Sequence, residues 1–219
     1  MDTKQPFVIT ISRELGSGGR TIGRKLAAQL NVRYSDKNLI KDLMEKFKLS
    51  TWEIERIKGQ KKNWLSEFLE AVAPVPNSGT YIGFEPLRGN HWNNSQVKVD
   101  EIYEAEAQIL RGIAEESSCV IAGRSGFFVL KGHPNKLDIF IQAPLEQRVE
   151  RVMKKQGLSE KEAREVIASV DESRENYVRR CAGVSRYDTR NYDLVLNVGE
   201  MSDDDAVACI LKYIKFISK

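Results

Sequence analysis

The residues best suited to chemistry lie in one glycine-rich segment near the N-terminus, Ser12–Thr21, which reads SRELGSGGRT. The general phosphate-binding pattern is G-x-x-x-x-G-K-[ST]. Aligned on Gly19, the segment places Arg20 at the lysine position and Thr21 at the hydroxyl position, and Glu14 replaces the first glycine. Glycines at positive φ let backbone N–H groups curl around an anion, and arginine binds phosphate oxygens in a fork. The segment therefore predicts a phosphate site.

We expect this phosphate site to use six consecutive residues: Gly16, Ser17, Gly18, Gly19, Arg20 and Thr21. The Thr21 hydroxyl is the candidate ligand for Mg²⁺, and Arg20 is the candidate catalytic cation. The Glu14 carboxylate would repel phosphates, so we expect it to turn outward and pair with Arg13 or Arg24. The alternative is an ordinary glycine-rich turn between a strand and a helix.

The elements around this segment must place it at the edge of a sheet. Residues 6–12 form a β-branched run that predicts a buried strand, and the apolar spacing of Thr21–Leu30 predicts a helix. Further strands are expected at Val32–Tyr34, Cys119–Ala122, Leu137–Gln142 and Asp193–Asn197, and further helices at Lys37–Phe47, Thr51–Val72, Val97–Glu116, Leu145–Lys155, Glu160–Arg180 and Asp204–Ile217. This alternation predicts an α/β fold of three layers, a parallel sheet with helices on both faces.

The composition excludes several classes of protein. Among 219 residues, 34 are Lys or Arg and 31 are Asp or Glu, so the net charge is only +3. Without a basic stripe interleaved with aromatic residues, we expect no nucleic-acid partner. No run reaches the roughly 20 apolar residues that a membrane span needs, and the N-terminal apolar stretch is too short for a secretory signal, so we expect a cytoplasmic protein. The three cysteines are interpreted as reduced thiols of the core.

One region stands apart from the predicted layers. Residues 73–96 contain three of the six prolines, and all three tryptophans fall within residues 51–96. Loops of this size are usually functional or disordered. We interpret residues 48–97 as an insertion that covers a site or contacts a partner, such as a second copy of the chain. The alternative is a surface loop over a helical hairpin.

Four blocks of sequence resemble the cytidylate kinase-like group of P-loop proteins. Residues 11–23 resemble the phosphate loop of that group, and residues 120–126, VIAGRSG, resemble its strand-end G-R-D-M-G segment with serine in place of the aspartate. Residues 142–151 resemble the step that opens the kinase lid, and residues 171–177 resemble the stretch that closes it.

The resemblance implies a single P-loop NTPase-type domain over residues 1–219 with a five-stranded parallel sheet. Within it, residues 48–97 would be the acceptor-side insertion and residues 148–190 a helical lid. The expected reaction is phosphoryl transfer from ATP, with Mg²⁺, to a small acceptor, most closely a nucleoside monophosphate such as CMP. The expected lid range holds eight of the 16 arginines, which suits a lid that closes over phosphates.

The resemblance also assigns roles to single residues. Arg124 and Ser125 would bind the acceptor, Arg148 would bind the donor nucleotide, and Arg151 and Arg174 would act from the lid. For Arg148 and Arg151, a solvated, salt-bridged helix face is the alternative.

Two further acceptor candidates lie after the second predicted strand. Asp36 would begin the acceptor helix or serve as its N-cap, and Lys41 is a weaker phosphate candidate.

Two rival functions are also compatible with this sequence. One is a kinase for a different small metabolite, which the altered insertion would permit. The other is a nucleotide-binding sensor without turnover, which Glu14 at the first-glycine position favours.

Overall fold

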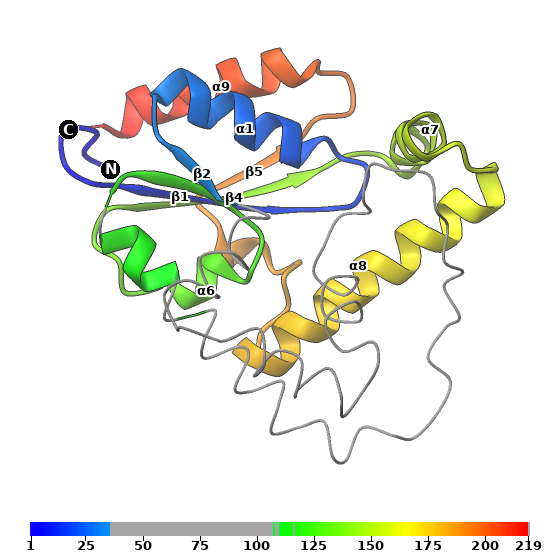
Figure 1. Cartoon of the computed structure of the whole chain (residues 1–219), viewed down its shortest axis with the longest axis horizontal. Helices are drawn as coiled ribbons and strands as arrows, with labels where there is room; N and C mark the ends of the chain where they lie inside the picture. Colours follow the sequence, from blue (N-terminus) through cyan, green and yellow to red (C-terminus); the bar gives the residue numbers. More distant parts are fainter. Residues whose placement is uncertain (36–106, 108–109, 116, 219) are drawn as a thin grey trace, which may run out of the picture.

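The computed structural model of the chain describes residues 1–35, 107, 110–115 and 117–218, and every structural statement below concerns these residues. Their centre is a five-stranded parallel sheet in the order β2-β3-β1-β4-β5 (Figure 1). The strands are β1 (Val8–Arg13), β2 (Arg33–Ser35), β3 (Cys119–Ala122), β4 (Lys136–Gln142) and β5 (Leu194–Asn197). Because β1 lies in the middle, its carboxyl end opens between those of β3 and β4, where ligands bind in open α/β sheets.

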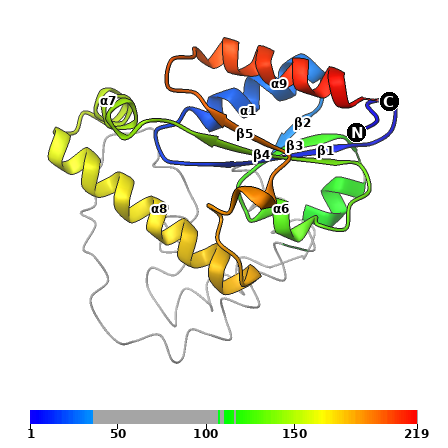
Figure 2. The ribbon, with the colours of Figure 1, turned by 180° about the vertical axis from the view of Figure 1, so that it is seen from behind.

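Helices lie on both sides of this sheet. Figures 1 and 2 show α1 (Gly19–Leu30) and α9 (Asp203–Ile217) side by side on one face, and α6 (Gly126–Val129) and α8 (Glu160–Ala182) toward the other. Helix α7 (Leu145–Gln156) lies beyond the carboxyl end of β4, and a short 3₁₀ turn, η2 (Thr189–Asn191), precedes β5. No helix in the described part of the chain is long and apolar enough to cross a membrane.

The alternation of side chains along β1 builds a core on each face of the sheet. Ile9 and Ile11 point toward α1 and pack with Ile22 and Leu26. Val8 belongs to the core of the opposite face. A third apolar cluster joins the glycine-rich segment to the two helices beyond the sheet edge; its buried members are Leu15, Val149, Val152, Ala163 and Ile167. This third cluster fixes α7 and α8 against the phosphate loop, with each helix supplying one apolar face.

The predicted α/β class and parallel sheet are confirmed, and every predicted strand lies within two residues of its observed bounds. The short helix α6 was not predicted, since four residues give too little periodicity to detect. The assignment of all three cysteines to the core is wrong: Cys119 is buried, but Cys181 is half-buried and Cys209 is exposed. The helices predicted at 37–47 and 51–72, most of that predicted at 97–116, and the insertion 48–97 with its tryptophans lie outside the described residues.

Candidate functional site

The glycine-rich segment forms a tight loop between β1 and α1. Gly16 and Gly18 adopt left-handed backbone conformations, with φ of 83° and 79°. A Cβ atom at Gly16 would lie 2.7 Å from the Arg148 carbonyl oxygen, and one at Gly18 would lie 2.6 Å from Arg151 Nη1. Only glycine combines this conformation with such close packing. The loop therefore has the backbone shape of an anion cradle, with α7 packed directly against it.

Glu14, the residue that departs from the phosphate-loop pattern, has partners of its own. One carboxylate oxygen accepts a hydrogen bond from the Ala143 N–H at 3.2 Å and lies 3.7 Å from Arg148 Nε. We expected Glu14 to pair with Arg13 or Arg24. The neighbouring Arg148 lies in α7, and the sequence spacing did not suggest it as a partner of Glu14. These contacts draw the carboxylate toward the β4–α7 junction and partly neutralise it, so it helps to anchor the loop.

Asp171 of α8 is the counter-ion for the arginines around the loop. Its Oδ2 accepts a hydrogen bond from Arg148 Nη1 at 2.6 Å, and its Oδ1 accepts one from the Leu15 N–H at 2.9 Å. The same Oδ1 lies 3.2 Å from Arg174 Nη1 and 3.5 Å from Arg186 Nη1. A single buried carboxylate thus touches three guanidinium groups and the phosphate loop, and it sets their relative positions.

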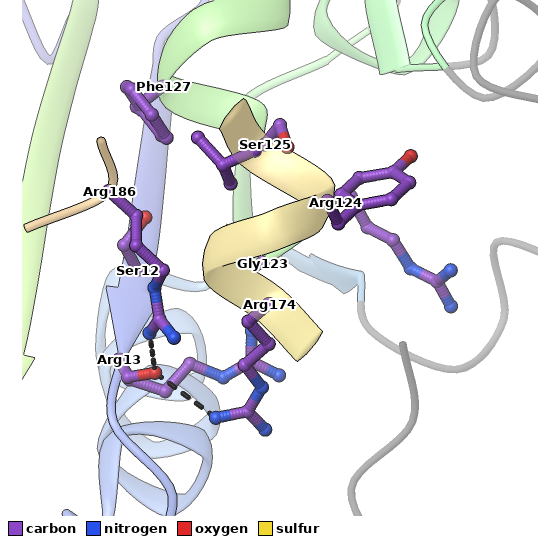
Figure 3. A pocket seen from close by; sticks show the side chains of 10 residues that line it. Ser12, Arg13, Gly123, Arg124, Ser125, Phe127, Arg174 and Arg186 are labelled. Carbon is purple, nitrogen blue, oxygen red and sulfur yellow. Dashed lines mark hydrogen bonds between the residues drawn. The ribbon is translucent and has the colours of Figure 1, made fainter. Parts of the chain in front are cut away.

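A hollow with a volume of about 40 Å³ lies beside the loop, at the carboxyl ends of β1 and β3. Figure 3 shows its lining, which includes four arginines: Arg13, Arg124, Arg174 and Arg186. The other lining residues are Ser12, Gly123, Ser125, Phe127, Tyr177 and Val178. No carboxylate is among the described residues that line this hollow, which we call the arginine pocket.

Arg13 joins the phosphate loop to the arginine pocket. Its Cβ lies 2.7 Å from where a Cβ at Gly19 would stand, and its guanidinium fills the space in front of Gly123. Its carbonyl oxygen accepts hydrogen bonds from Arg174 Nη1, at 3.2 Å, and from Arg186 Nη2, both drawn in Figure 3. The two sites are therefore separated by the length of one buried side chain.

The arginine pocket holds more positive than negative charge. Burial, followed by the guanidinium groups of Arg13 and Arg186, lowers the pKa of Arg174 to about 9. The Asp171 carboxylate opposes this shift without cancelling it. Arg186 is also held between aromatic rings, with its guanidinium carbon 5.1 Å from the Tyr187 ring centroid. Guanidinium groups crowded in this way favour a bound anion, because an anion relieves their mutual repulsion.

The backbone beside the arginine pocket is strained. Three consecutive residues have left-handed conformations: Gly123 at φ 88°, Arg124 at 60° and Ser125 at 52°. For a residue with a side chain this conformation costs roughly 1–2 kcal/mol. The Ser125 hydroxyl is buried and has no hydrogen-bond partner among the residues that the structure describes. Strain and an unsatisfied polar group at one position are characteristic of a site where a ligand binds.

Comparison with known proteins places this chain in a protein family. The model of the cytidylate kinase-like family matches residues 8–200, which include every described strand. The chain belongs to the cytidylate kinase-like family. A relative named cytidylate kinase from Pyrococcus horikoshii is 26% identical over 208 residues, 94% of this chain and 88% of that protein. Another of that name from Methanopyrus kandleri is 33% identical over 108 residues, which are 46% of this chain and 56% of that protein.

Solved structures agree with the fold of this family member. A crystal structure of an uncharacterized protein from Eubacterium ventriosum has a TM-score of 0.65 and 25% identity, and the match covers 95% of this chain and 98% of that one. A shikimate kinase from Bacteroides thetaiotaomicron matches with a TM-score of 0.50 and 14% identity over 95% of this chain and 98% of that one. The second likeness shows the fold alone, which is that of P-loop kinases.

The structure of this cytidylate kinase-like chain brings most predicted site residues to the edge where β1 and β3 end. Arg20 and Thr21 lie in the first turn of α1, with Thr21 exposed. Arg151 lies over Gly18, with Nη1 3.8 Å from Asp203 Oδ1. Arg124, Ser125 and Arg174 line the arginine pocket. Asp36 and Lys41 lie outside the described residues.

Arg148 has a different environment from the one its predicted role requires. It was expected to bind the donor nucleotide, yet its guanidinium is buried and bonded to Asp171 and to the Leu15 carbonyl at 3.3 Å. In this arrangement Arg148 holds the phosphate loop to α7 and α8. The alternative prediction for Arg148, a solvated and salt-bridged helix face, had the right kind of interaction. It had the wrong environment, because the ion pair between Arg148 and Asp171 is buried.

Sequence reasoning missed two of the arginines in the pocket. Arg13 could have been found, because it is the last residue of a strand that runs into the phosphate loop, at the edge where ligands bind. Arg186 gives no such signal, since it follows α8 in an irregular turn and is placed in the pocket by tertiary contacts with Phe140, Asp171 and the Arg13 carbonyl.

Proposed function

We propose that the protein transfers a phosphoryl group from ATP to a small acceptor that carries a phosphate. The proposed acceptor is a nucleoside monophosphate such as CMP. The observation that carries this proposal is the arginine pocket, which lies one side chain away from a glycine cradle for phosphates. A kinase must hold two anionic reactants within reach of each other, and an adjacent pair of anion sites meets that need. The cytidylate kinase-like relatives support the choice of acceptor.

The donor site would be the loop Gly16–Thr21. Its left-handed glycines fit phosphate oxygens that approach the backbone closely, and Arg20 would supply the cation. Thr21 is exposed at the start of α1, so its hydroxyl would hold Mg²⁺, which neutralises phosphate charge when it is bound. Arg151 lies beside the same loop and would stabilise the charge that spreads over the transferred group.

The acceptor site would be the arginine pocket. The acceptor phosphate would be bound by Arg124, Arg174, Arg13 and Arg186. The Ser125 hydroxyl, which has no partner within the described ranges, would donate to an oxygen of the acceptor. A phosphate oxygen is already an anionic nucleophile, so the reaction needs alignment and charge neutralisation and no general base. Arg148 would position the glycine-rich loop and would not bind the donor nucleotide, because its guanidinium is bonded to Asp171.

The contacts of Glu14 weaken the sensor hypothesis. That hypothesis rested on a carboxylate facing the phosphates, and the observed hydrogen bond from Ala143 and the neighbouring Arg148 give the carboxylate a structural use. A kinase for another small metabolite remains the second candidate. It is favoured by Ser125, because a neutral hydroxyl leaves the pocket more cationic than a carboxylate would and so suits a more anionic acceptor.

The test is a panel of acceptors incubated with Mg-ATP, with ADP release measured in each case. Nucleoside monophosphates and small phosphorylated or carboxylated metabolites are compared at equal concentration. We expect CMP or another nucleoside monophosphate to give the largest kcat/KM. A preference for a non-nucleotide acceptor would support the second candidate. Tight ATP binding in calorimetry without transfer to any acceptor would overturn the kinase proposal.

A further inference from the structure

A buried charged pair lies beneath the arginine pocket, on the α6 side of the sheet. Lys136 and Asp138 stand two residues apart on β4, each side chain is 9% exposed, and they form an ion pair. The Thr10 hydroxyl of β1 donates a hydrogen bond to the other Asp138 oxygen. Burial raises the pKa of the Asp138 carboxyl although its bonds to Lys136 and Thr10 oppose the shift. A buried ion pair of this kind adds little stability compared with apolar residues of similar size, so stability alone does not explain why Lys136 and Asp138 are present.

Lys136 makes one contact that points toward the pocket. Its Nζ donates a hydrogen bond to the Phe127 carbonyl oxygen at 2.9 Å. Phe127 lines the arginine pocket and lies two residues after Ser125, in the helix that follows the left-handed turn. The strained turn at Gly123–Ser125 is therefore tied to the sheet by an ammonium group.

Asp138 ties down the opposite side of the same pocket. Its backbone N–H donates to Asp193 Oδ2 at 2.8 Å, and the Asp193 N–H donates back to the Asp138 carbonyl at 2.8 Å. The preceding residue, Tyr192, packs on Phe127 with ring centroids 5.2 Å apart. Its hydroxyl donates to the Arg186 carbonyl at 2.7 Å. The Lys136 ammonium is thus linked to the segment that carries Ser125, and the backbone at Asp138 is linked to the segment that carries Arg186.

We propose that Lys136 is a positioning residue of the acceptor pocket: by holding the Phe127 carbonyl it fixes the turn that presents Arg124 and Ser125. It touches no reactant itself. This inference rests on the proposed function, which makes the pocket the acceptor site. A turn that is free to relax would leave the phosphate loop intact and misplace only the acceptor groups, and a displacement of about 1 Å can cost up to a hundredfold in rate.

The decisive variant is Lys136→Met, which keeps a long side chain and removes the ammonium. We expect the KM for the acceptor to rise about tenfold or more while the KM for ATP stays within twofold. Lys136→Arg should recover most of the loss, because a guanidinium can still donate to both oxygens. Lys131→Met is the matched control, since Lys131 is exposed on the segment that follows α6, and it should change neither KM.

Loss of folding is separated from loss of positioning by the double variant Lys136→Met with Asp138→Asn. It leaves no unpaired buried carboxylate, so its melting temperature should exceed that of the single variant, yet the acceptor KM should stay raised. The inference is overturned if the double variant restores the acceptor KM, or if ATP and acceptor KM rise equally in both variants.

A second readout does not depend on kinase activity. Inorganic phosphate is titrated calorimetrically into Arg20→Ala protein, which weakens binding at the glycine loop, with and without Lys136→Met. Weaker phosphate binding with Lys136→Met supports the inference, and equal binding opposes it. If the unaltered protein transfers phosphate to no acceptor, the proposed function fails, while this titration still decides whether Lys136 positions the pocket.

Discussion

Replacing Asp171 by asparagine tests the electrostatic architecture of the site most directly. The asparagine carbonyl can still accept the hydrogen bond from the Leu15 N–H, so the backbone anchor of the phosphate loop is kept. What is lost is the negative charge, and the amide NH₂ then faces Arg148 Nη1, which stood 2.6 Å from the carboxylate. Two donors in contact cannot bond, so the buried Arg148 loses its short ion pair and keeps only the more distant Glu14 carboxylate, 3.7 Å from its Nε.

The magnitude follows from the burial of the pair. The side chains of Arg148 and Asp171 are 10% and 9% exposed, and removing one partner of a buried ion pair costs about 3–5 kcal/mol. For a chain of this size, 1 kcal/mol corresponds to about 2–4 °C in melting temperature. We therefore expect Asp171→Asn to melt about 6–20 °C below the unaltered protein. Arg174 and Arg186, which also contact Asp171, place the result in the upper part of that range.

The assay is thermal unfolding followed by circular dichroism at pH 7, with Asp188→Asn as control. Asp188 forms an ion pair with Arg190 at 2.7 Å, but that arginine side chain is 87% exposed, so water replaces the pair and the melting temperature should hardly change. A drop of less than about 2 °C for Asp171→Asn would refute the view that Asp171 is the counter-ion of the buried arginines.

Four further predictions concern single side chains. Arg20→Ala should weaken ATP binding in calorimetry by about 10- to 150-fold, the value of a charged hydrogen bond, and unchanged binding would refute the assignment of the loop. Arg124→Ala should raise the acceptor KM more than the ATP KM, and the reverse order would mean that the two sites are exchanged. Asp203→Asn should tighten ATP binding about twofold to fivefold, because it removes a negative charge beside the glycine-rich loop. The Asp203 Oδ1 lies 2.7 Å from where a Cβ at Gly18 would stand. Weaker ATP binding in this variant would contradict the prediction. Burial raises the pKa of the Cys119 thiol from 9.0 to about 11, so the thiol ionises at lower pH in the unfolded chain than in the folded one. The free energy of unfolding, measured in urea titrations, should therefore fall by about 2–3 kcal/mol between pH 9 and 11. Cys119→Ala should not show this loss.

The order of strands and helices was predictable because short-range patterns encode it. The β-branched run before the glycine segment and the apolar spacing after it predict β1 and α1 within two residues of their observed bounds. The glycine-rich loop between β1 and α1 was predictable for the same reason, since it is one continuous stretch of sequence.

The partners of the charged residues could not be predicted in this way. A guanidinium behaves differently in water, against a carboxylate or beside other guanidiniums, and the sequence alone does not specify which surroundings it has. Arg148 and Arg174 look alike in an arginine-rich helical stretch, and both contact Asp171, yet Arg148 is bonded to the Leu15 carbonyl of the glycine-rich loop and Arg174 lines the arginine pocket. The distinction arises because α7 carries Arg148 and α8 carries Arg174, and the two helices pack against the glycine-rich loop only in the folded chain.

By itself, the sequence determined the parallel α/β fold, the glycine cradle and the presence of arginines suited to phosphate chemistry. The tertiary structure decided which arginines share a pocket, because Arg13, Arg124 and Arg186 lie far apart in the chain and are joined only where strands and turns converge. It also decided that Glu14 anchors the loop through Ala143. Local propensity fixes the elements, whereas long-range packing sets the distances between charges, and these distances decide what each charge can do.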